Sequence, residues 1–337
     1  GSHIQADIYT HLMRQRLQEM APGMNGGRGL IFPFRMAKTN NPSNYLVRYT
    51  GNWDYCKSTQ KNKDCILGLT GISVTTSDSI AEIIIDPNRG SPIFYEFERV
   101  RIFHLPTSYH LFVSINDTLF LGKYHYDGGY TEIQLPKNIS LLQLMIQKDT
   151  LDDDFTLLGI SLDNVSPGIV YNAIGVNGSK LSSYLRCSLY QNHLKAIDPQ
   201  LVIFSIGTND AYTTRFNEEK YRQEYRQLLD STKKAVPNAA ILLTVPNDSY
   251  LYRRYANRNT VKMKEIIFDL AEEYNCGVWD LYTIMGGLNS SQAWYALNLM
   301  NYDRIHFNRN GYLLKGELLF SAILKGWEQQ LPLPENY

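Results

Sequence analysis

The sequence lacks several features that mark particular classes of protein. Its 337 residues carry 33 basic and 33 acidic side chains, so the formal net charge is zero, and no long basic run is present. This balance argues against a nucleic-acid binder, which usually shows a basic excess or stripe. No apolar stretch approaches the roughly 18 residues that a membrane-spanning helix needs. We therefore expect a soluble globular protein with no nucleic-acid partner and no membrane span.

Cysteine is scarce, and its spacing excludes a common kind of metal site. The four cysteines do not resemble paired zinc ligands. Cys56 and Cys65 lie nine residues apart in a polar stretch and could close a small loop through a disulfide. Cys187 and Cys276 lie in apolar segments, which is typical of buried packing residues. The possible disulfide favours an oxidising compartment.

The pattern of apolar residues divides the chain into two parts. Residues 4–20 have helical spacing, whereas residues 31–165 show short alternating runs separated by turn residues, typical of a β-sandwich or jelly roll. After Pro167, strands alternate with helices, which indicates a parallel α/β architecture. We therefore predict one discontinuous α/β domain, residues 1–30 and 166–337, with an inserted β-sandwich module over residues 31–165.

The predicted α/β elements after Pro167 follow from runs of apolar residues. Strands are expected over residues 169–174, 201–206, 240–245 and 277–279. Helices are expected over residues 181–195, 217–236, 255–275 and 311–327. Ligands of such sheets bind outside the carboxyl ends of the strands, so the residues directly after each strand are candidates for a site.

Two polar patches follow predicted strands. In Gly207-Thr208-Asn209-Asp210, after residues 201–206, the Asn209 side chain can present an N–H group to a developing oxyanion. The same four residues also suit an Asx turn that only ends a strand. In Gly175-Val176-Asn177-Gly178, after residues 169–174, the glycines allow a backbone N–H to approach a substrate. An ordinary strand-to-helix turn would look the same.

A third patch, Asp303-Arg304-Ile305-His306, precedes the last predicted helix. An Asp three residues before a His can orient the imidazole and stabilise its cation, which leaves the other ring nitrogen to act as a general base. The alternative is a charged pair in a surface loop.

Taken in chain order, residues 175–178, 207–210 and 303–306, the three patches resemble the blocks of the SGNH (GDSL-like) hydrolases. That family has a nucleophilic Ser near its N-terminus, an oxyanion Gly, an oxyanion Asn in Gly-x-Asn-Asp, and a terminal Asp-x-x-His. Gly178, Asn209, Asp303 and His306 match the last three blocks. The first block reads Gly-Asp-Ser in the family, whereas this chain begins Gly1-Ser2-His3.

The first block leaves two interpretations open. Gly-Ser-His is also a common cloning remnant. In the members most similar to this chain, however, the nucleophile runs into a His and then a helix, as Ser2-His3 does here. We therefore assign Ser2 as the nucleophile. The family also places a strand before it, between residues 169–174 and 201–206, for which this chain has no residues, so we expect the natural protein to extend upstream.

The resemblance implies a flavodoxin-like, three-layer SGNH hydrolase domain with a parallel sheet. Bacterial peptidoglycan O-acetylesterases of this class carry a carbohydrate-binding-like β-sandwich inserted after the first block, as predicted here. The resemblance thus implies removal of O-acetyl groups from a cell-wall glycan, in the periplasm or outside the cell. Acetylxylan esterases and other carbohydrate acetylesterases share the motifs, so the sugar stays open.

The implied mechanism needs no metal or organic cofactor. Ser2 attacks the ester carbonyl while His306, held by Asp303, takes its proton, and Ser2 N–H, Gly178 N–H and the Asn209 side chain stabilise the oxyanion. Two other functions stay open: a carbohydrate-binding or scaffold protein without a nucleophile, and a sugar O-acetyltransferase. Aromatic residues of the insert are expected either to stack on glycan rings or to pack the module: Trp53, Tyr55, Tyr95, Tyr124, Tyr126 and Tyr130.

Overall fold

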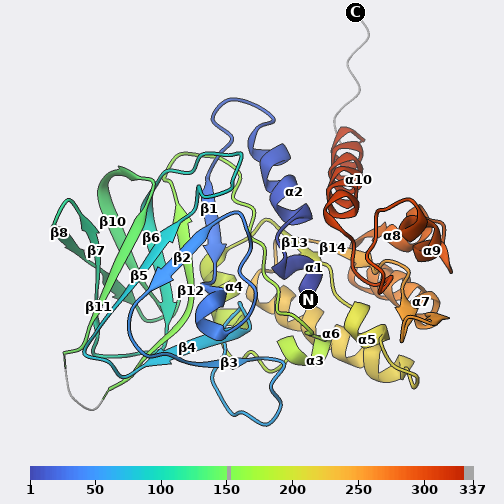
Figure 1. The fold of residues 1–337 in the computed structure, drawn as a ribbon, viewed down its shortest axis with the longest axis horizontal. Helices are drawn as coiled ribbons and strands as arrows, with labels where there is room; N and C mark the ends of the chain where they lie inside the picture. The colour runs from blue at the N-terminus through green and yellow to red at the C-terminus, as the bar shows by residue number, and fades with distance from the viewer. Residues whose placement is uncertain (150–152, 330–337) are drawn as a thin grey trace, which may run out of the picture.

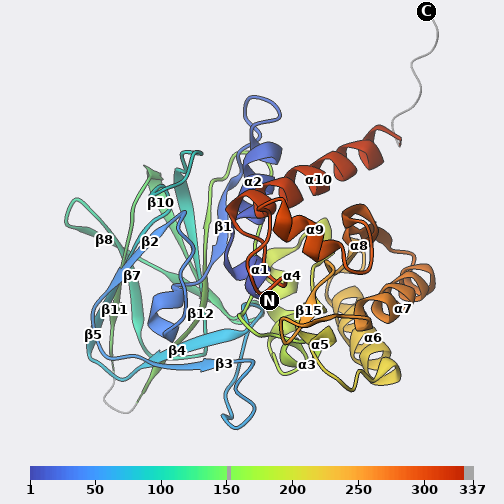
Figure 2. The ribbon, with the colours of Figure 1, turned by 45° about the vertical axis from the view of Figure 1, so that its right-hand side comes forward.

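The computed structural model describes residues 1–149 and 153–329. A half made of antiparallel sheets lies beside a helical half, and the N-terminus lies between them (Figures 1 and 2). No helix in the described residues is long and apolar enough to cross a membrane.

The first antiparallel sheet contains seven strands of the described residues. Its path runs β3 (Asp54–Lys57), β4 (Ile72–Thr76), β12 (Phe155–Asp163), β6 (Phe97–His104), β10 (Tyr130–Ile139) and β9 (Lys123–His125), and β1 (Gly27–Ile31) pairs with β12. β1 thus brings residues 27–31 into this sheet, a few residues before the pattern of short alternating runs begins in the sequence.

The second antiparallel sheet has five strands in the order β2 (Leu46–Tyr49), β5 (Ile80–Asp86), β11 (Leu142–Gln147), β7 (His110–Ile115) and β8 (Thr118–Leu121). Along β5, Ala81, Ile83 and Ile85 are fully buried and alternate with half-buried residues. They pack in one core with residues of the first sheet such as Val74 and Ile102. Burying such a side chain contributes roughly 1.5–3 kcal/mol, so this alternation holds the two sheets together.

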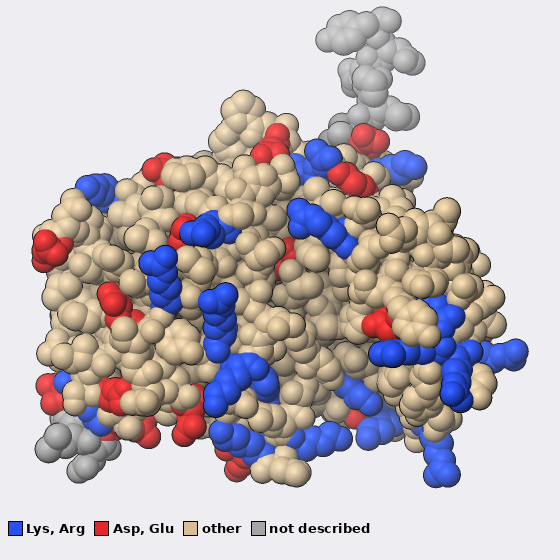
Figure 3. Space-filling model, in the orientation of Figure 1, with Lys and Arg blue, Asp and Glu red and all other residues tan. Residues whose placement is uncertain are grey.

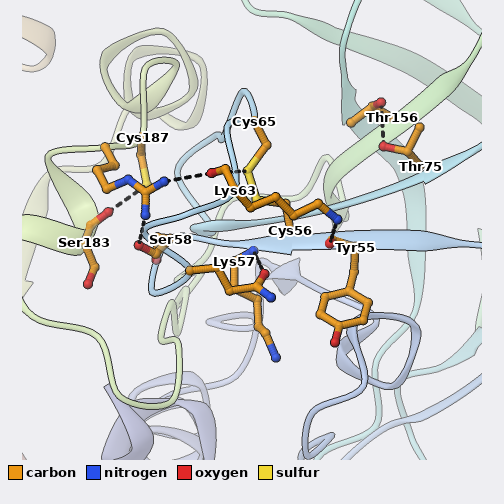
Figure 4. The surroundings of a disulfide bond; sticks show 12 residues. Tyr55, Cys56, Lys57, Ser58, Lys63, Cys65, Thr75, Thr156, Ser183 and Cys187 are labelled. Atoms are coloured by element: carbon orange, nitrogen blue, oxygen red, sulfur yellow. Dashed lines mark hydrogen bonds between the residues drawn. A yellow bond between two sulfur atoms is a disulfide. The ribbon is translucent and has the colours of Figure 1, made fainter.

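A disulfide joins Cys56 of β3 to Cys65, as predicted, with Cα atoms 6.5 Å apart (Figure 4). Cys187 is free and buried, whereas Cys276 is free but only half-buried, which corrects the prediction that both are buried.

Removing the disulfide is expected to lower the free energy of unfolding. A Cys56→Ser, Cys65→Ser double variant should lose about 2–3 kcal/mol, because the unfolded chain regains the entropy of the closed loop. Urea unfolding under non-reducing conditions measures this. Cys276→Ser, which removes a free thiol, is the control, and an equal small loss in both variants would contradict the prediction.

The helical half is built on a parallel sheet, β13 (Leu201–Phe204), β14 (Ala240–Val245) and β17 (Gly277–Asp280), with β14 in the middle. Helices cover both faces. Leu243 of β14 packs with residues of α4 (Tyr190–Ile197), α6 (Glu218–Ala235) and α7 (Asn259–Tyr274). Leu242 packs on the other face against residues of α2 (Tyr9–Gln18), α8 (Leu281–Met285), α9 (Ser290–Ala296) and α10 (Arg309–Glu328). The result is a three-layer arrangement.

Residues 169–174 do not form the predicted strand. Among the described residues, their only ladder contact is an isolated parallel bridge from Ile169 to Asn25. Over residues 1–149 and 153–329, β13 is the edge strand of the parallel sheet and pairs only with β14. No strand of that sheet therefore lies beside residues 169–174 to complete their backbone hydrogen bonds. The segment is therefore extended but not a sheet member.

Three predicted helices are shorter or interrupted. The N-terminal helix divides into α1 (Ser2–Gln5) and α2 at Asp7, which has a φ of +46°. Residues 181–195 divide into α3 (Leu181–Tyr184) and α4, because Leu189 N–H donates to the carbonyl of Leu67 in the β-rich half. The helix expected from residue 255 begins at Asn259, since Tyr255–Ala256 forms β16 and pairs with β15 (Tyr250–Leu251).

Candidate active site

Ser2, His306 and Asp303 lie in a chain of contacts between the N-terminus and the loop before α10. Ser2 Oγ lies 2.9 Å from His306 Nε2, and His306 Nδ1 lies 2.8 Å from Asp303 Oδ2. An ionised carboxylate only accepts hydrogen bonds, so Nδ1 carries the ring proton and donates it to Asp303. Nε2 then has a free lone pair that faces the Ser2 hydroxyl. This is the arrangement in which an imidazole accepts a proton from a serine.

The Asp303 carboxylate is held by its own loop. Its Oδ1 accepts the backbone N–H groups of Ile305 and His306, at 2.8 and 3.0 Å. Burial opposes ionisation of Asp303, but the hydrogen bonds from the His306 ring and from these two amides outweigh it and lower the pKa of Asp303 to about 2. The carboxylate therefore stays charged near neutral pH. All three of these donors belong to Ile305 and His306, so the spacing of three residues is enough to hold Asp303 against the ring.

The predicted oxyanion donors lie around Ser2. Ser2 is the first residue of α1, where backbone N–H groups have no partner within the helix. Gly178 has a φ of +78°, which side-chain-bearing residues rarely adopt, and the space where its Cβ would be is open. Asn209 Nδ2 donates to the Ser179 carbonyl at 3.0 Å, and one of its two N–H groups is left for another acceptor.

The segments of Gly178 and Asn209 are packed directly against the N-terminal helix. A Cβ on Gly1 would lie 3.1 Å from Asn209 Nδ2, so this amide adjoins the residue before Ser2. A Cβ on Gly175 would lie 2.7 Å from Ile4 Cβ, so only glycine allows this approach. Asn177 N–H donates to Gln5 Oε1 at 2.7 Å and ties the same segment to α1. The structure therefore brings all five predicted site residues together.

His3 is a further residue of the site that was not predicted from the sequence. It is buried, its Nδ1 lies 2.9 Å from the Tyr312 hydroxyl, and its ring centre lies 5.2 Å from that of His306. Burial, and then the charges of Lys315 and His306, lower the pKa of His3 well below its usual range. His3 is therefore a neutral ring that packs beside His306. In the sequence, the Ser2-His3 pair was the only signal.

Asp210 is a buried carboxyl beside Asn209. Its Oδ1 accepts the Leu181 N–H at 3.2 Å, whereas its Oδ2 is buried and has no hydrogen-bond partner in the described residues. Burial raises the pKa of Asp210 to about 7. The folded protein thus binds this proton more tightly than the unfolded chain, so the stability that it contributes is complete below about pH 4 and is lost as the pH rises through about 7.

The stability of an Asp210→Asn variant is expected to depend less on pH than that of the parent protein. The amide oxygen can still accept from Leu181, but the group no longer titrates. Between pH 5 and 8, the Tm of the parent protein should fall relative to that of the variant by several degrees, on the order of 2–4 °C per kcal/mol. Differential scanning calorimetry at matched ionic strength measures the difference. A constant difference in Tm across this range would contradict the prediction.

The aromatic residues singled out in the insert differ in exposure. Tyr95 is fully buried, which excludes it from stacking on a ligand, and Trp53 packs against the core of the two antiparallel sheets. Tyr126 is 84% exposed and contacts Tyr124 edge-on. Packing accounts for Tyr95, and Trp53 and Tyr55 are half-buried against that core. A glycan-stacking role stays a prediction for the exposed Tyr126 and for the other half-buried rings, Tyr124 and Tyr130.

Known proteins resemble this chain in sequence over part of its length and in structure over nearly all of it. Residues 152–314 match the GDSL-like Lipase/Acylhydrolase family. The structure of a peptidoglycan O-acetylesterase superimposes with a TM-score of 0.80 over 98% of this chain and 90% of its own, at 21% identity. At this identity the likeness shows a shared fold.

Other solved structures match less of the chain. The structure of an acetyl xylan esterase aligns with 44% of this chain and 78% of its own, at 22% identity and a TM-score of 0.36. A lipase/acylhydrolase from Enterococcus faecalis aligns with 48% of this chain and 77% of its own at 19% identity and a TM-score of 0.36. No curated protein sequence matches the chain.

Proposed function

We propose that the chain is a serine esterase that removes O-acetyl groups from a carbohydrate. Two findings support this: residues 152–314 match the GDSL-like Lipase/Acylhydrolase family, and the structure shares its fold with a peptidoglycan O-acetylesterase. The observation that carries this proposal is the run of contacts from Ser2 Oγ through His306 to the Asp303 carboxylate. In this proposal Ser2, His306 and Asp303 are catalytic, and Ser2 N–H, Gly178 N–H and Asn209 form the oxyanion hole.

The reaction proceeds in two steps. Ser2 Oγ forms a bond to the acetyl carbon while its proton passes to His306 Nε2, and the sugar oxygen then leaves with that proton. Water next attacks the acetyl-serine and gives up a proton to the same nitrogen. The Ser2–acetyl bond breaks, acetate leaves and the Ser2 hydroxyl is restored. Both tetrahedral intermediates place a negative oxygen among the three N–H donors.

For the substrate, we propose bacterial cell-wall peptidoglycan or another O-acetylated polysaccharide. The solved structure that superimposes on 98% of the chain, a peptidoglycan O-acetylesterase, supports this choice. The two antiparallel sheets would then be a jelly-roll-like β-sandwich module over residues 31–165, inserted between residues 1–30 and 166–337 of the hydrolase domain. The Cys56–Cys65 disulfide supports a periplasmic or secreted location.

The proposal is tested by covalent labelling and product analysis. A serine-reactive phosphonate should label Ser2 and block hydrolysis of a chromogenic acetate, whereas a binding or scaffold protein would show neither effect. Incubation with an acetyl donor and a sugar acceptor separates the transferase alternative: acetate is the product of the esterase, and an acetylated sugar is the product of the transferase. A labelled residue other than Ser2 would overturn the assignment.

Removing the Asn209 amide is expected to slow turnover rather than weaken binding. Asn209→Ala should lower kcat for a small acetate by about 100- to 1,000-fold with little change in KM, because the oxyanion forms only on the way to the intermediate. Steady-state kinetics measures both constants. Asn217→Ala, which changes the helix cap of α6, is a control for the loss of an asparagine side chain. A change confined to KM would contradict the oxyanion role.

A further inference from the structure

Lysine side chains gather around one tyrosine on the β-rich half. The Nζ atoms of Lys57, Lys63 and Lys38 lie 4.9, 5.7 and 5.8 Å from the centre of the Tyr55 ring. They come from separate segments: Lys57 ends β3, Lys63 lies in the disulfide loop, and Lys38 follows the short helix η1 (Phe34–Ala37). The electron-rich ring face attracts each ammonium group. We call these four residues the lysine cluster.

Lys38, Lys57 and Lys63 form no ion pair with any of the residues that the structure describes. In the part of the chain that the structure describes, the lysines that form ion pairs are Lys220, Lys262 and Lys264. Their distances to the ring centre place the three ammonium groups within roughly 12 Å of one another, so they repel at low salt, where the Debye length is about 30 Å at 0.01 M, and less at physiological salt, where it is about 8 Å. A bound anion would relieve this repulsion.

The loop that carries Lys63 is held in place, so the cluster is preformed. The disulfide closes the loop, and Lys63 Nζ donates to the Tyr55 carbonyl at 2.6 Å (Figure 4). Arg186 donates to the carbonyls of Ser58 and Lys63, at 3.0 Å each. These partners are neutral carbonyls, so Arg186 adds a further positive charge beside the loop.

The lysine cluster adjoins the wall of the candidate active site. Thr39, the neighbour of Lys38, accepts hydrogen bonds from Gln5 of α1 at 3.0 Å and from Asn177 at 3.3 Å. Gln5 shares its helix with Ser2, and Asn177 precedes Gly178. In the space-filling view, basic side chains gather below and beside the centre of this face, where acidic ones are fewer (Figure 3).

We propose that the lysine cluster is an anion subsite that binds carboxylate groups of a polymeric substrate while its acetyl ester lies at Ser2. The inference rests on the proposed function and narrows it: the substrate is a carboxylate-bearing glycan rather than a neutral polysaccharide. Peptidoglycan, whose peptide stems carry carboxylates, has this chemistry, and acetylxylan without acidic substituents does not. Attraction between the three lysines and the carboxylates of the polymer raises the rate at which enzyme and substrate associate, and it weakens as salt is added.

The test compares two polymers and two triple variants. Lys38→Gln, Lys57→Gln, Lys63→Gln removes the cluster charges, and Lys220→Gln, Lys234→Gln, Lys325→Gln removes the same charge from the exposed surface of α6 and α10. Each is assayed at low salt on O-acetylated peptidoglycan, on acetylated neutral xylan and on 4-nitrophenyl acetate. The cluster variant should lose about 10-fold or more in kcat/KM on peptidoglycan alone, and 0.5 M NaCl should remove most of that difference.

A binding measurement keeps this test separate from the proposed function. Both triple changes are placed in the Ser2→Ala background, and sedimentation with insoluble peptidoglycan then reports binding without turnover. Weaker binding of the cluster variant than of the control supports the subsite. Equal losses in both triple variants, or an equal loss on both polymers, would overturn it. Failure of the proposed function appears elsewhere, as hydrolysis of 4-nitrophenyl acetate that survives Ser2→Ala.

Discussion

Replacing Ser2 by Ala is expected to lower kcat for a small acetate by about 10⁵- to 10⁶-fold, and replacing His306 by Ala is expected to cost nearly as much. The two side chains act as one unit: Ser2 Oγ lies 2.9 Å from His306 Nε2, so neither works without the other. The double variant should therefore be about as slow as either single variant.

Pre-steady-state and steady-state kinetics with 4-nitrophenyl acetate measure these losses. The burst of nitrophenol that marks an acetyl-serine should vanish in both single variants. Mass spectrometry of acid-quenched protein should find the acetyl group on the peptide that contains Ser2. Ser179→Ala, which removes a nearby serine hydroxyl outside the proposed triad, is the control. Losses that multiply in the double variant, or a burst that survives Ser2→Ala, would refute Ser2 as the nucleophile.

The parts of the molecule that the sequence predicted well are those set by local interactions. β14 has the predicted bounds, because its residues are covered by helices on both faces and read as one apolar run. The Asp303–His306 pair also follows from local geometry, since a spacing of three residues suffices to bring the carboxylate to the ring. β5 likewise shows the alternation predicted within residues 31–165, because the two faces of a strand have different neighbours.

The parts that were missed depend on residues far away in the chain. Asp7 interrupts the N-terminal helix because its buried carboxylate accepts from Arg28 and Asn44, 21 and 37 residues along the chain. The role of His3 depends on Tyr312, 309 residues away. Residues 169–174 have the composition of a strand, but a strand exists only where another lies beside it. Composition and spacing carry no information about such partners.

Replacing Asp303 by Asn is expected to lower kcat by about 10⁴-fold with little change in KM. In the parent protein, Asp303 Oδ1 accepts two backbone N–H groups and Oδ2 accepts the His306 Nδ1 proton. The asparagine oxygen is the group that can still accept from the two amides, so its NH₂ is turned towards His306 Nδ1. That nitrogen must then accept, and the ring proton moves to Nε2, which can no longer take the proton of Ser2.

The pH dependence separates this tautomer effect from a loss of structure. Because the pKa of Asp303 is lowered to about 2, the parent carboxylate is charged throughout the range from pH 5 to 9 and adds no titration of its own to the rate. Asp303→Asn should therefore lower the rate at every pH in that range while Tm stays within a few degrees of the parent value. Asp303→Ala, which also removes the acceptor of the Ile305 and His306 amides, should lower both kcat and Tm. If Asp303→Asn retained parent-like kcat, the carboxylate would not be what orients His306, and the Ser2–His306 pair would act alone.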